Sequence, residues 1–310
     1  MVDVVTLGET LLAFRVAGPL AVGAEARFSF AGAESNVAVG LARLGHAVAC
    51  AGAVGGDAMA TTMVRALRGE GIDCSALRVD ATRPSALIVF DSPLAERRRV
   101  TYLRDGSAGS ALTPADADAV WALNPGVVHV TGVTCALGDG ARETVEVVVA
   151  EARRRGVTVS FDLNYRASLW GRDEAAAVLG PLARQADILF GADDELRLAL
   201  DDAAPTDDAL RALGPAQVVL KRGADGAGLV TAEGRFDAPS VATAVVDPVG
   251  AGDAFAAGFL SAHLDGLGPV ERLGRGNAVA AFALGNHGDW EGLPTRAELP
   301  LVGAGGDVVR

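Results

Sequence analysis

The stretch Asp247-Pro-Val-Gly-Ala-Gly-Asp253 decides the fold, because it joins a glycine-rich turn to the start of a helix. Pro248 cannot continue a strand ladder, Gly250 and Gly252 permit a tight turn, and the apolar spacing that follows is helical. Backbone N–H groups at such a helix start favour an anion. Asp253 would stand beside that anion, where a carboxylate can accept a proton from an attacking hydroxyl. The turn predicts a phosphoryl-transfer site; the alternative is an ordinary turn whose aspartate only favours the helix start.

Two other glycine motifs do not fit this chain. It has no Gly-x-x-x-x-Gly-Lys-Ser/Thr motif, and Gly250-x-Gly252 is followed by Phe255 where a dinucleotide fingerprint needs glycine. The sequence therefore disfavours a P-loop enzyme and a dinucleotide-binding dehydrogenase.

Short apolar runs alternate with helical patterns along most of the chain. The runs have the character of strands that are buried on both faces, and several helical patterns end at a glycine. The alternation predicts an α/β fold with an open, mostly parallel sheet, helices on both faces, and ligands beyond the carboxyl ends of the strands. The expected strands are 4–8, 47–54, 127–131, 157–162, 188–190 and 218–221, and the expected helices are 35–44, 58–70, 141–155 and 193–200.

Two pairs of alternating segments interrupt this pattern. Residues 11–16 with 27–32, and 85–91 with 99–104, have no helical pattern between the members of each pair. They predict two antiparallel hairpins that form a small antiparallel sheet, a lid that would exclude water and offer an edge to a second subunit. No change of composition marks a linker, so we expect one domain over 1–310, with the lid built from about 11–32 and 85–104 and a tail that frays from residue 303.

Composition limits the possible partners and compartment. The chain has 310 residues, half of them hydrophobic, and a net charge of −12, which allows a large core and disfavours nucleic acid and anionic membranes as partners. It shows no basic leader and no apolar run of membrane-spanning length, so we expect a cytoplasmic protein. The three cysteines, Cys50, Cys74 and Cys135, are scattered and are expected to be buried free thiols.

Lys221 is the only lysine in the chain. It follows a short apolar strand and opens a second glycine-rich turn, Lys221-Arg-Gly-Ala-Asp-Gly-Ala-Gly228. A chain that otherwise uses arginine could keep a lysine where a compact ammonium is needed, or could retain it by chance.

These features together resemble the ribokinase-type (PfkB) carbohydrate kinases, and within that family the 2-keto-3-deoxygluconate kinases. The resemblance runs from residue 4 to about residue 294 and implies a ribokinase-like fold. The matching motifs are Asp247–Asp253, Gly32–Ala38 (Gly-Ala-Glu-Ser-Asn-Val-Ala), Tyr102–Ala108, Asp162–Arg166 with Leu169-Trp170, and Gly288–Gly292.

The resemblance implies a role for each matching position. Asp253 would be the catalytic base, and the amides of Gly250, Ala251 and Gly252 would form the anion hole. Glu195 would help to hold Mg²⁺ through water; the alternative is ordinary helix-start acidity. The implied sugar-binding residues are Gly32, Tyr102, Leu103, Arg104, Arg166, Asp253 and Asp289. The implied ATP-binding residues are Asn164, Ala192, Lys221, Arg222, Gly223, Ala224, Asp225, Gly226, Ala227 and Asn277.

The implied activity is ATP-dependent phosphorylation of 2-keto-3-deoxygluconate on its terminal hydroxyl. Arg104 and Arg166 favour a sugar acid, because guanidinium groups suit a carboxylate; their alternatives are a strand-edge charge and a surface ion pair. A kinase of a neutral sugar such as fructose or ribose, or of a nucleoside, is the second hypothesis, and a non-catalytic binding protein is the third. The gluconate and galactonate epimers are not distinguished, nor is a dimer distinguished from a larger homo-oligomer.

Three positions depart from the family pattern, and one could hold a further ion. Ala192 stands where Asn or Ser is usual, Ala31 replaces a glycine, and Leu87 replaces a tyrosine of some relatives. These changes bear on substrate preference and metal geometry. Asp247 could contribute to a monovalent-cation site, as it does in some relatives.

Overall fold

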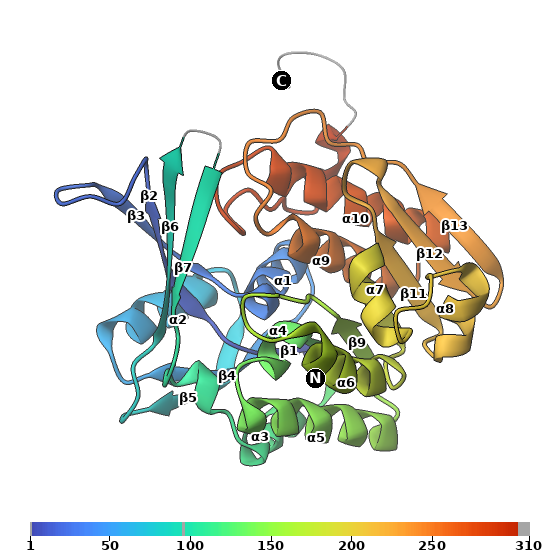
Figure 1. Ribbon diagram of the computed structural model, residues 1–310, viewed down its shortest axis with the longest axis horizontal. Helices are drawn as coiled ribbons and strands as arrows, with labels where there is room; N and C mark the ends of the chain where they lie inside the picture. The colour runs from blue at the N-terminus through green and yellow to red at the C-terminus, as the bar shows by residue number, and fades with distance from the viewer. Residues whose placement is uncertain (1, 95–96, 303–310) are drawn as a thin grey trace.

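The computed structural model describes residues 2–94 and 97–302, and its main sheet has nine strands within those residues (Figure 1). The strand order is β13-β12-β11-β10-β9-β8-β1-β4-β5. All neighbours from β11 to β5 are parallel, whereas β11, β12 and β13 form an antiparallel edge. The strands are β1 (Val2–Leu7), β4 (Val48–Gly55), β5 (Asp73–Asp80), β8 (Pro125–Thr131), β9 (Thr158–Asp162), β10 (Ile188–Gly191), β11 (Gln217–Lys221), β12 (Ala227–Thr231) and β13 (Gly234–Ala238).

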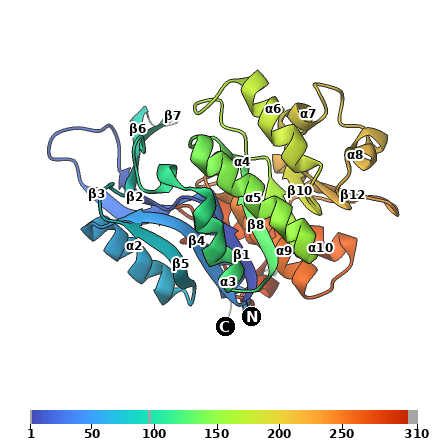
Figure 2. The ribbon, with the colours of Figure 1, turned by 90° about the horizontal axis from the view of Figure 1, so that it is seen from below.

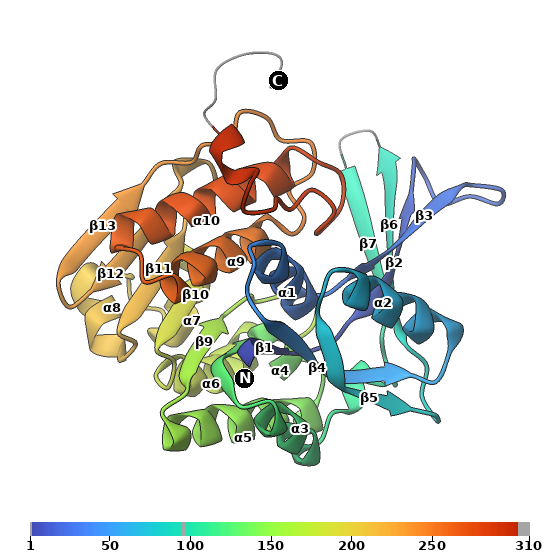
Figure 3. The same ribbon diagram turned by 180° about the vertical axis from the view of Figure 1, so that it is seen from behind.

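Helices cover both faces of this sheet because its strands are apolar on both sides. Successive side chains of a strand point to opposite faces, so Val5 joins one core and Val4 the other. The first core packs against α3 (Ala117–Ala122), α5 (Asp139–Arg155), α6 (Arg172–Ala183), α7 (Asp193–Ala199) and α8 (Asp207–Leu213). The second packs against α1 (Ala33–Arg43), α2 (Ala58–Gly69), α9 (Ala251–Leu264) and α10 (Pro269–Leu284). Figure 2 shows α5 across β8 on one face, and Figure 3 shows α1, α9 and α10 together on the other.

A separate small sheet stands to one side of the main sheet (Figure 1). It contains β3 (Ala26–Ala31), β2 (Leu11–Val16), β6 (Ala86–Leu94) and β7 (Arg97–Leu103), in that order. The two predicted hairpins, β2–β3 and β6–β7, are both antiparallel. The two hairpins lie side by side through parallel pairing of β2 with β6. These two strands can run in the same direction because the chain between the hairpins passes through α1, β4, α2 and β5 before it returns.

The predicted strands and helices agree with the structure to within a few residues. The mostly parallel sheet with helices on both faces is confirmed, and all three cysteines are buried and free. The prediction did not include β5, the β12–β13 hairpin, α3, the short α4 (Gly132–Cys135), α6, α8 or α10. No helix in the described ranges has the length and apolar character needed to cross a membrane.

Candidate active site

The glycine turn at 247–253 leads into α9, as predicted. Gly250 is the N-cap of this helix, with φ of 78°, and a side chain there would overlap the backbone oxygen of Asp289. Glycine is therefore required at this position by both conformation and space. The amide of Ala254 donates to the Gly250 carbonyl at 2.8 Å, and the amide of Ala251 makes only a long bond of 3.4 Å to Pro248. The amides of the first helical turn are thus the donors available to an anion.

Asp253 lies in that first turn between two asparagine amides. Asn36 Nδ2 donates to Asp253 Oδ2 at 2.8 Å, and Asn164 Nδ2 lies 3.5 Å from Oδ1. Burial raises the pKa of Asp253 from 3.8 to about 6, although the Asn36 hydrogen bond lowers it. The amide oxygens of both asparagines are buried and have no hydrogen-bond partner in the described part of the chain. They are free to accept hydrogen bonds from a ligand beside the carboxylate.

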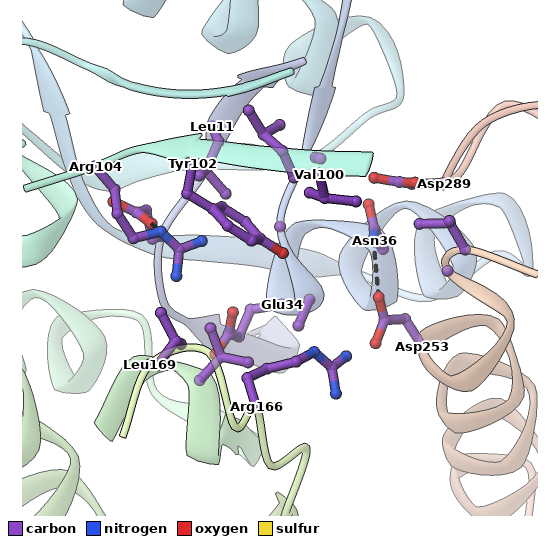
Figure 4. Close-up of a pocket in the computed structure, with 18 of the residues that line it drawn as sticks. Leu11, Glu34, Asn36, Val100, Tyr102, Arg104, Arg166, Leu169, Asp253 and Asp289 are labelled. Atoms are coloured by element: carbon purple, nitrogen blue, oxygen red, sulfur yellow. Dashed lines mark hydrogen bonds and ion pairs between the residues drawn. The ribbon is translucent and has the colours of Figure 1, made fainter. Parts of the chain in front are cut away.

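A cavity of about 170 Å³ lies beside Asp253, between the small sheet and the ends of the main-sheet strands (Figure 4). It is smaller than the ~300–1,000 Å³ that holds drug-sized ligands, which suits a small substrate. The structure brings together here, from distant parts of the sequence, the predicted residues Gly32, Tyr102, Arg104, Arg166, Gly250, Asp253 and Asp289.

The two arginines differ in their surroundings. Arg104 is 8% exposed, its Nε lies 3.3 Å from Glu9 Oε2, and its guanidinium packs 4.3 Å from the centre of the Tyr102 ring. Arg166 is exposed, and its Nη1 donates to the backbone oxygen of Tyr165 at 3.1 Å. Within 2–94 and 97–302, Arg166 forms no ion pair with a carboxylate. Its charge is therefore the more available to an anionic substrate.

Three other carboxyl groups line the cavity. Burial raises the pKa of Asp289 to about 7 even though Arg15 pairs with it, and burial raises the pKa of Glu34 to about 7 against hydrogen bonds from Thr134 and Thr131. The third, Glu9, accepts a hydrogen bond from a serine hydroxyl at 2.9 Å. The prediction named Asp289 but neither glutamate.

Leu103 was predicted to contact the sugar but does not line the cavity. Its side chain is 59% exposed, whereas Tyr102 and Arg104 on either side of it face the cavity. The alternation of side chains along β7 explains the difference. A contact between Leu103 and the sugar stays a prediction. Because the side chain points away from the cavity, only the backbone of Leu103 could make this contact.

Lys221 lies at the end of β11 and points toward the glycine turn. Its Nζ is 2.7 Å and 2.8 Å from the two carboxylate oxygens of Asp162 and 3.9 Å from Glu195 Oε2. A β-carbon built on Gly252 would lie 3.9 Å from the same Nζ, so the ammonium reaches the start of α9. Burial lowers the pKa of Lys221, but Asp162 and Glu195 more than offset this, and the net shift is upward. Lys221 is therefore a stable cation beside the predicted anion hole.

The remaining residues predicted for ATP lie outside the cavity. Arg222 to Gly226 form the turn between β11 and β12, in which Gly226 has φ of 83° and packs against the backbone of Ala238. This turn contains Gly223, Ala224 and Asp225, and Ala227 begins β12. Asn277 is buried in α10, and its Nδ2 donates to the backbone oxygens of Ala238 at 3.2 Å and Pro239 at 2.9 Å. Asn277 thus supports the backbone that packs against the turn.

Glu195 and Ala192 meet at the start of α7. Glu195 is buried; its Oε2 accepts from the amide of Ala192 at 2.8 Å and its Oε1 from the amide of Tyr165 at 2.9 Å. Ala192 is the N-cap residue of α7 but has no side chain that could cap the helix. The carboxylate of Glu195 accepts a hydrogen bond at this helix start instead. In the ranges that the structure covers, no three His, Cys, Asp or Glu side chains are grouped as metal ligands.

Comparison with known proteins agrees with this geometry. The chain is 34% identical to 2-dehydro-3-deoxygluconokinase of Thermoproteus tenax, with 96% of this chain and 93% of that protein covered. It is 37% identical to 2-dehydro-3-deoxygluconokinase of Bacillus subtilis, with 96% and 94% covered. The solved structure of a PfkB protein from Polaromonas sp. JS666 superposes with a TM-score of 0.85 at 36% identity, covering 97% of this chain and 99% of that one. The family model for pfkB carbohydrate kinases matches residues 1–296, and the chain belongs to this family.

Proposed function

We propose that this kinase transfers the γ-phosphoryl group of ATP to the terminal hydroxyl of 2-keto-3-deoxygluconate, also called 2-dehydro-3-deoxygluconate. The product is 2-keto-3-deoxy-6-phosphogluconate. One observation supports this reaction most: a single small cavity contains a carboxylate with a raised pKa, a helix start and two arginines. Relatives that carry the name of this activity match nearly the whole chain.

Asp253 serves as the general base in this reaction. Its carboxylate takes the proton of the terminal hydroxyl as the hydroxyl oxygen bonds to the γ-phosphorus and the bond to the β–γ bridging oxygen breaks, releasing ADP. The pKa of about 6 leaves the group ionised at pH 7 and more basic than an exposed aspartate. The amides of Gly250, Ala251 and Gly252 lie where they can stabilise the charge that develops on the phosphoryl oxygens.

The nucleotide side is built around Lys221. Its ammonium lies between the Asp162 carboxylate and the start of α9, where it can attract the phosphates of ATP. Mg²⁺ bound to the phosphates would supply further neutralisation of charge. Both carboxylate oxygens of Glu195 already accept backbone hydrogen bonds, so this residue suits a water-mediated rather than a direct contact with the ion.

The small sheet fits the role of a lid and of a contact between subunits. It contributes Tyr102 and Arg104 to the cavity wall, and it leaves Phe28 67% and Leu103 59% exposed. Exposed apolar side chains on a sheet favour pairing with a second copy, so we infer a homo-oligomer formed through the lid.

The test of substrate class uses the difference between the two arginines. Wild type, Arg166→Ala and Arg104→Ala are each assayed with 2-keto-3-deoxygluconate and with fructose. A charge-assisted hydrogen bond contributes about 1.5–3 kcal/mol, so Arg166→Ala should lower kcat/KM for the sugar acid by about 10- to 150-fold. The same variant should lose much less kcat/KM with fructose, because fructose has no carboxylate. Arg104→Ala should lower kcat/KM for both substrates, because Glu9 is left buried without its partner.

Other outcomes would identify the alternatives. A wild-type preference for fructose, or an equal loss on both substrates in Arg166→Ala, would favour a neutral-sugar kinase. No ATP turnover with any sugar or sugar acid would favour a non-catalytic binding protein. Separate assays of the gluconate and galactonate epimers would resolve the remaining choice of substrate.

A further inference from the structure

The carboxylate of Asp247, at the start of the glycine turn, is surrounded by four donors. Asp247 is 1% exposed, and Oδ1 accepts from the amide of Val249 at 3.1 Å and pairs with Arg98. Oδ2 is 3.4 Å from Arg15 Nη1 and 3.4 Å from the amide of Gly288. Burial alone would raise the pKa of Asp247, but the Arg98 and backbone hydrogen bonds hold it below its ordinary value. Asp247 is therefore an ionised carboxylate with two guanidinium partners.

Both guanidinium groups come from the small sheet. Arg15 lies on β2 and Arg98 on β7, whereas Asp247 belongs to the turn that precedes α9. Arg15 also pairs with Asp289, whose backbone oxygen packs against Gly250, and it lies 4.1 Å from the centre of a phenylalanine ring of β6. Arg98 additionally donates to the backbone oxygen of Val246 at 3.4 Å. These contacts join the small sheet to the start of the glycine turn and, through Asp289, to Gly250 within it.

The charges at this place bear directly on phosphate binding. Asp247, Asp253 and Asp289 surround the turn that is to receive a phosphoryl group, and the charge of Asp253 adds to burial in raising the pKa of Asp289. Three carboxylates next to an anion hole oppose an incoming phosphate unless cations offset them. Arg15 and Arg98 are the nearest cations to Asp247 in the described residues.

A monovalent cation at Asp247 does not fit this arrangement, because it would compete with two guanidinium groups for the same buried oxygens. We propose that Arg15 and Arg98 take the place of such a cation. They are positioning residues that neutralise Asp247 and hold the glycine turn in shape when the small sheet is seated over it. The catalytic turn is thereby coupled to the position of the lid, and the kinase works without K⁺. This inference rests on the proposed kinase reaction but not on the identity of the sugar.

A second cavity allows the proposal to be tested by chemical rescue with a small cation. It has a volume of about 490 Å³ and is lined by, among others, Arg15, Arg98, Asp247 and His287. A small cation added to the solution can therefore reach Asp247 once a guanidinium group has been removed.

The experiment compares Arg98→Ala with Arg98→Lys and with Arg99→Ala. Arg99 is a matched control on the same strand, because it pairs at 2.6 Å with Asp91 rather than with Asp247. Each protein is assayed with its fastest acceptor, at constant ionic strength, in tetramethylammonium chloride, potassium chloride and guanidinium chloride at ~50 mM. Guanidinium is dilute enough there to leave the fold intact, and thermal unfolding in each salt checks this.

We expect wild type and Arg99→Ala to change kcat by less than about twofold between tetramethylammonium and K⁺. In tetramethylammonium, Arg98→Ala should lose about 10- to 100-fold in kcat, as expected when an anion hole is misplaced, with the acceptor KM little changed. Arg98→Lys should retain most of the activity, and K⁺ or guanidinium should restore at least about fivefold in Arg98→Ala.

Each contrary result removes the proposal. Strong activation of wild type by K⁺ would show that the arginines do not replace the cation. An Arg98→Ala variant as active as Arg99→Ala would show that the contact is dispensable. A loss that neither salt nor lysine recovers would show a packing defect rather than a missing charge. Failure of the proposed sugar acid as a substrate changes only the acceptor used and leaves this test intact.

Discussion

Asp253→Asn should make the protein inactive and more stable at the same time. The variant keeps the shape of the side chain and can still present an oxygen to Asn36 Nδ2, but it has no basic group. Loss of a general base lowers kcat by about 10²- to 10⁴-fold, and ATP should bind as before. Activity and stability are thus expected to move in opposite directions.

The gain in stability follows from the pKa of this carboxyl. Burial raises the pKa of Asp253 from 3.8 to about 6, so the folded protein holds the proton more tightly than the unfolded chain does. The charged form is therefore disfavoured in the folded state, and the penalty is fully present above about pH 6 and vanishes as pH falls toward 3.8. A rise of this size corresponds to about 3 kcal/mol, and some solvent contact reduces it, so we expect the free energy of unfolding at pH 7 to increase by about 1–3 kcal/mol.

Urea unfolding of wild type and Asp253→Asn, from pH 7 down to about pH 4.5, measures this difference, and a coupled assay of ADP release measures kcat. The stability advantage of the variant should shrink as the pH falls. Asp139→Asn is the control, because Asp139 has a fully exposed side chain at the start of α5. Near-normal turnover would remove the general-base role. A variant less stable than wild type at pH 7 would refute the account of burial.

Three further changes test other parts of the site. Lys221→Met should destabilise the fold by about 3–5 kcal/mol and raise the KM for ATP, and Asp162→Asn in the same chain should recover part of the stability because it removes the stranded charge. Gly250→Ala should lower kcat by about 10- to 100-fold, whereas Gly266→Ala, with a similar φ of 72° but open space around it, should cost stability only. Asn36→Ala removes a hydrogen bond that lowers the pKa of the base, so the acid limb of the pH–rate profile should move up by about 0.5–1 pH unit. An unchanged ATP KM, equal kcat in the two glycine variants, or an unmoved profile would contradict the respective assignment.

The sequence was most informative where local chemistry and tertiary structure require the same residues. Parallel strands such as β8 and β10 are apolar on both faces, so their positions were predicted closely. Gly250 was identified as a turn residue, and in the structure its conformation and its packing both exclude a side chain. At these places a local pattern is sufficient to predict the fold.

Parts of the site that depend on burial could not be predicted in the same way. Glu34 and Asn36 belong to a recognised motif, but only the structure shows that they are 2% and 3% exposed, that both line the cavity, and that Asn36 donates to Asp253. Their polarity would place them on the outside of α1 by pattern alone. No local sequence pattern indicated a role for Arg15, because its partners Asp247 and Asp289 lie more than 200 residues away in the sequence.

The way in which charges are paired sharpens the choice of substrate. In a chain with a net charge of −12, Lys221 on the nucleotide side is paired with Asp162 and Arg104 is paired with Glu9, so neither offers an unpaired positive charge to a substrate carboxylate. Arg166 lines the cavity, and in the described ranges no carboxylate pairs with it. Binding a substrate carboxylate there requires no existing ion pair to break, whereas binding it at Arg104 means sharing the guanidinium with a buried glutamate. Recognition of the acid should therefore depend more on Arg166 than on Arg104, and it should weaken with rising salt because Arg166 is exposed.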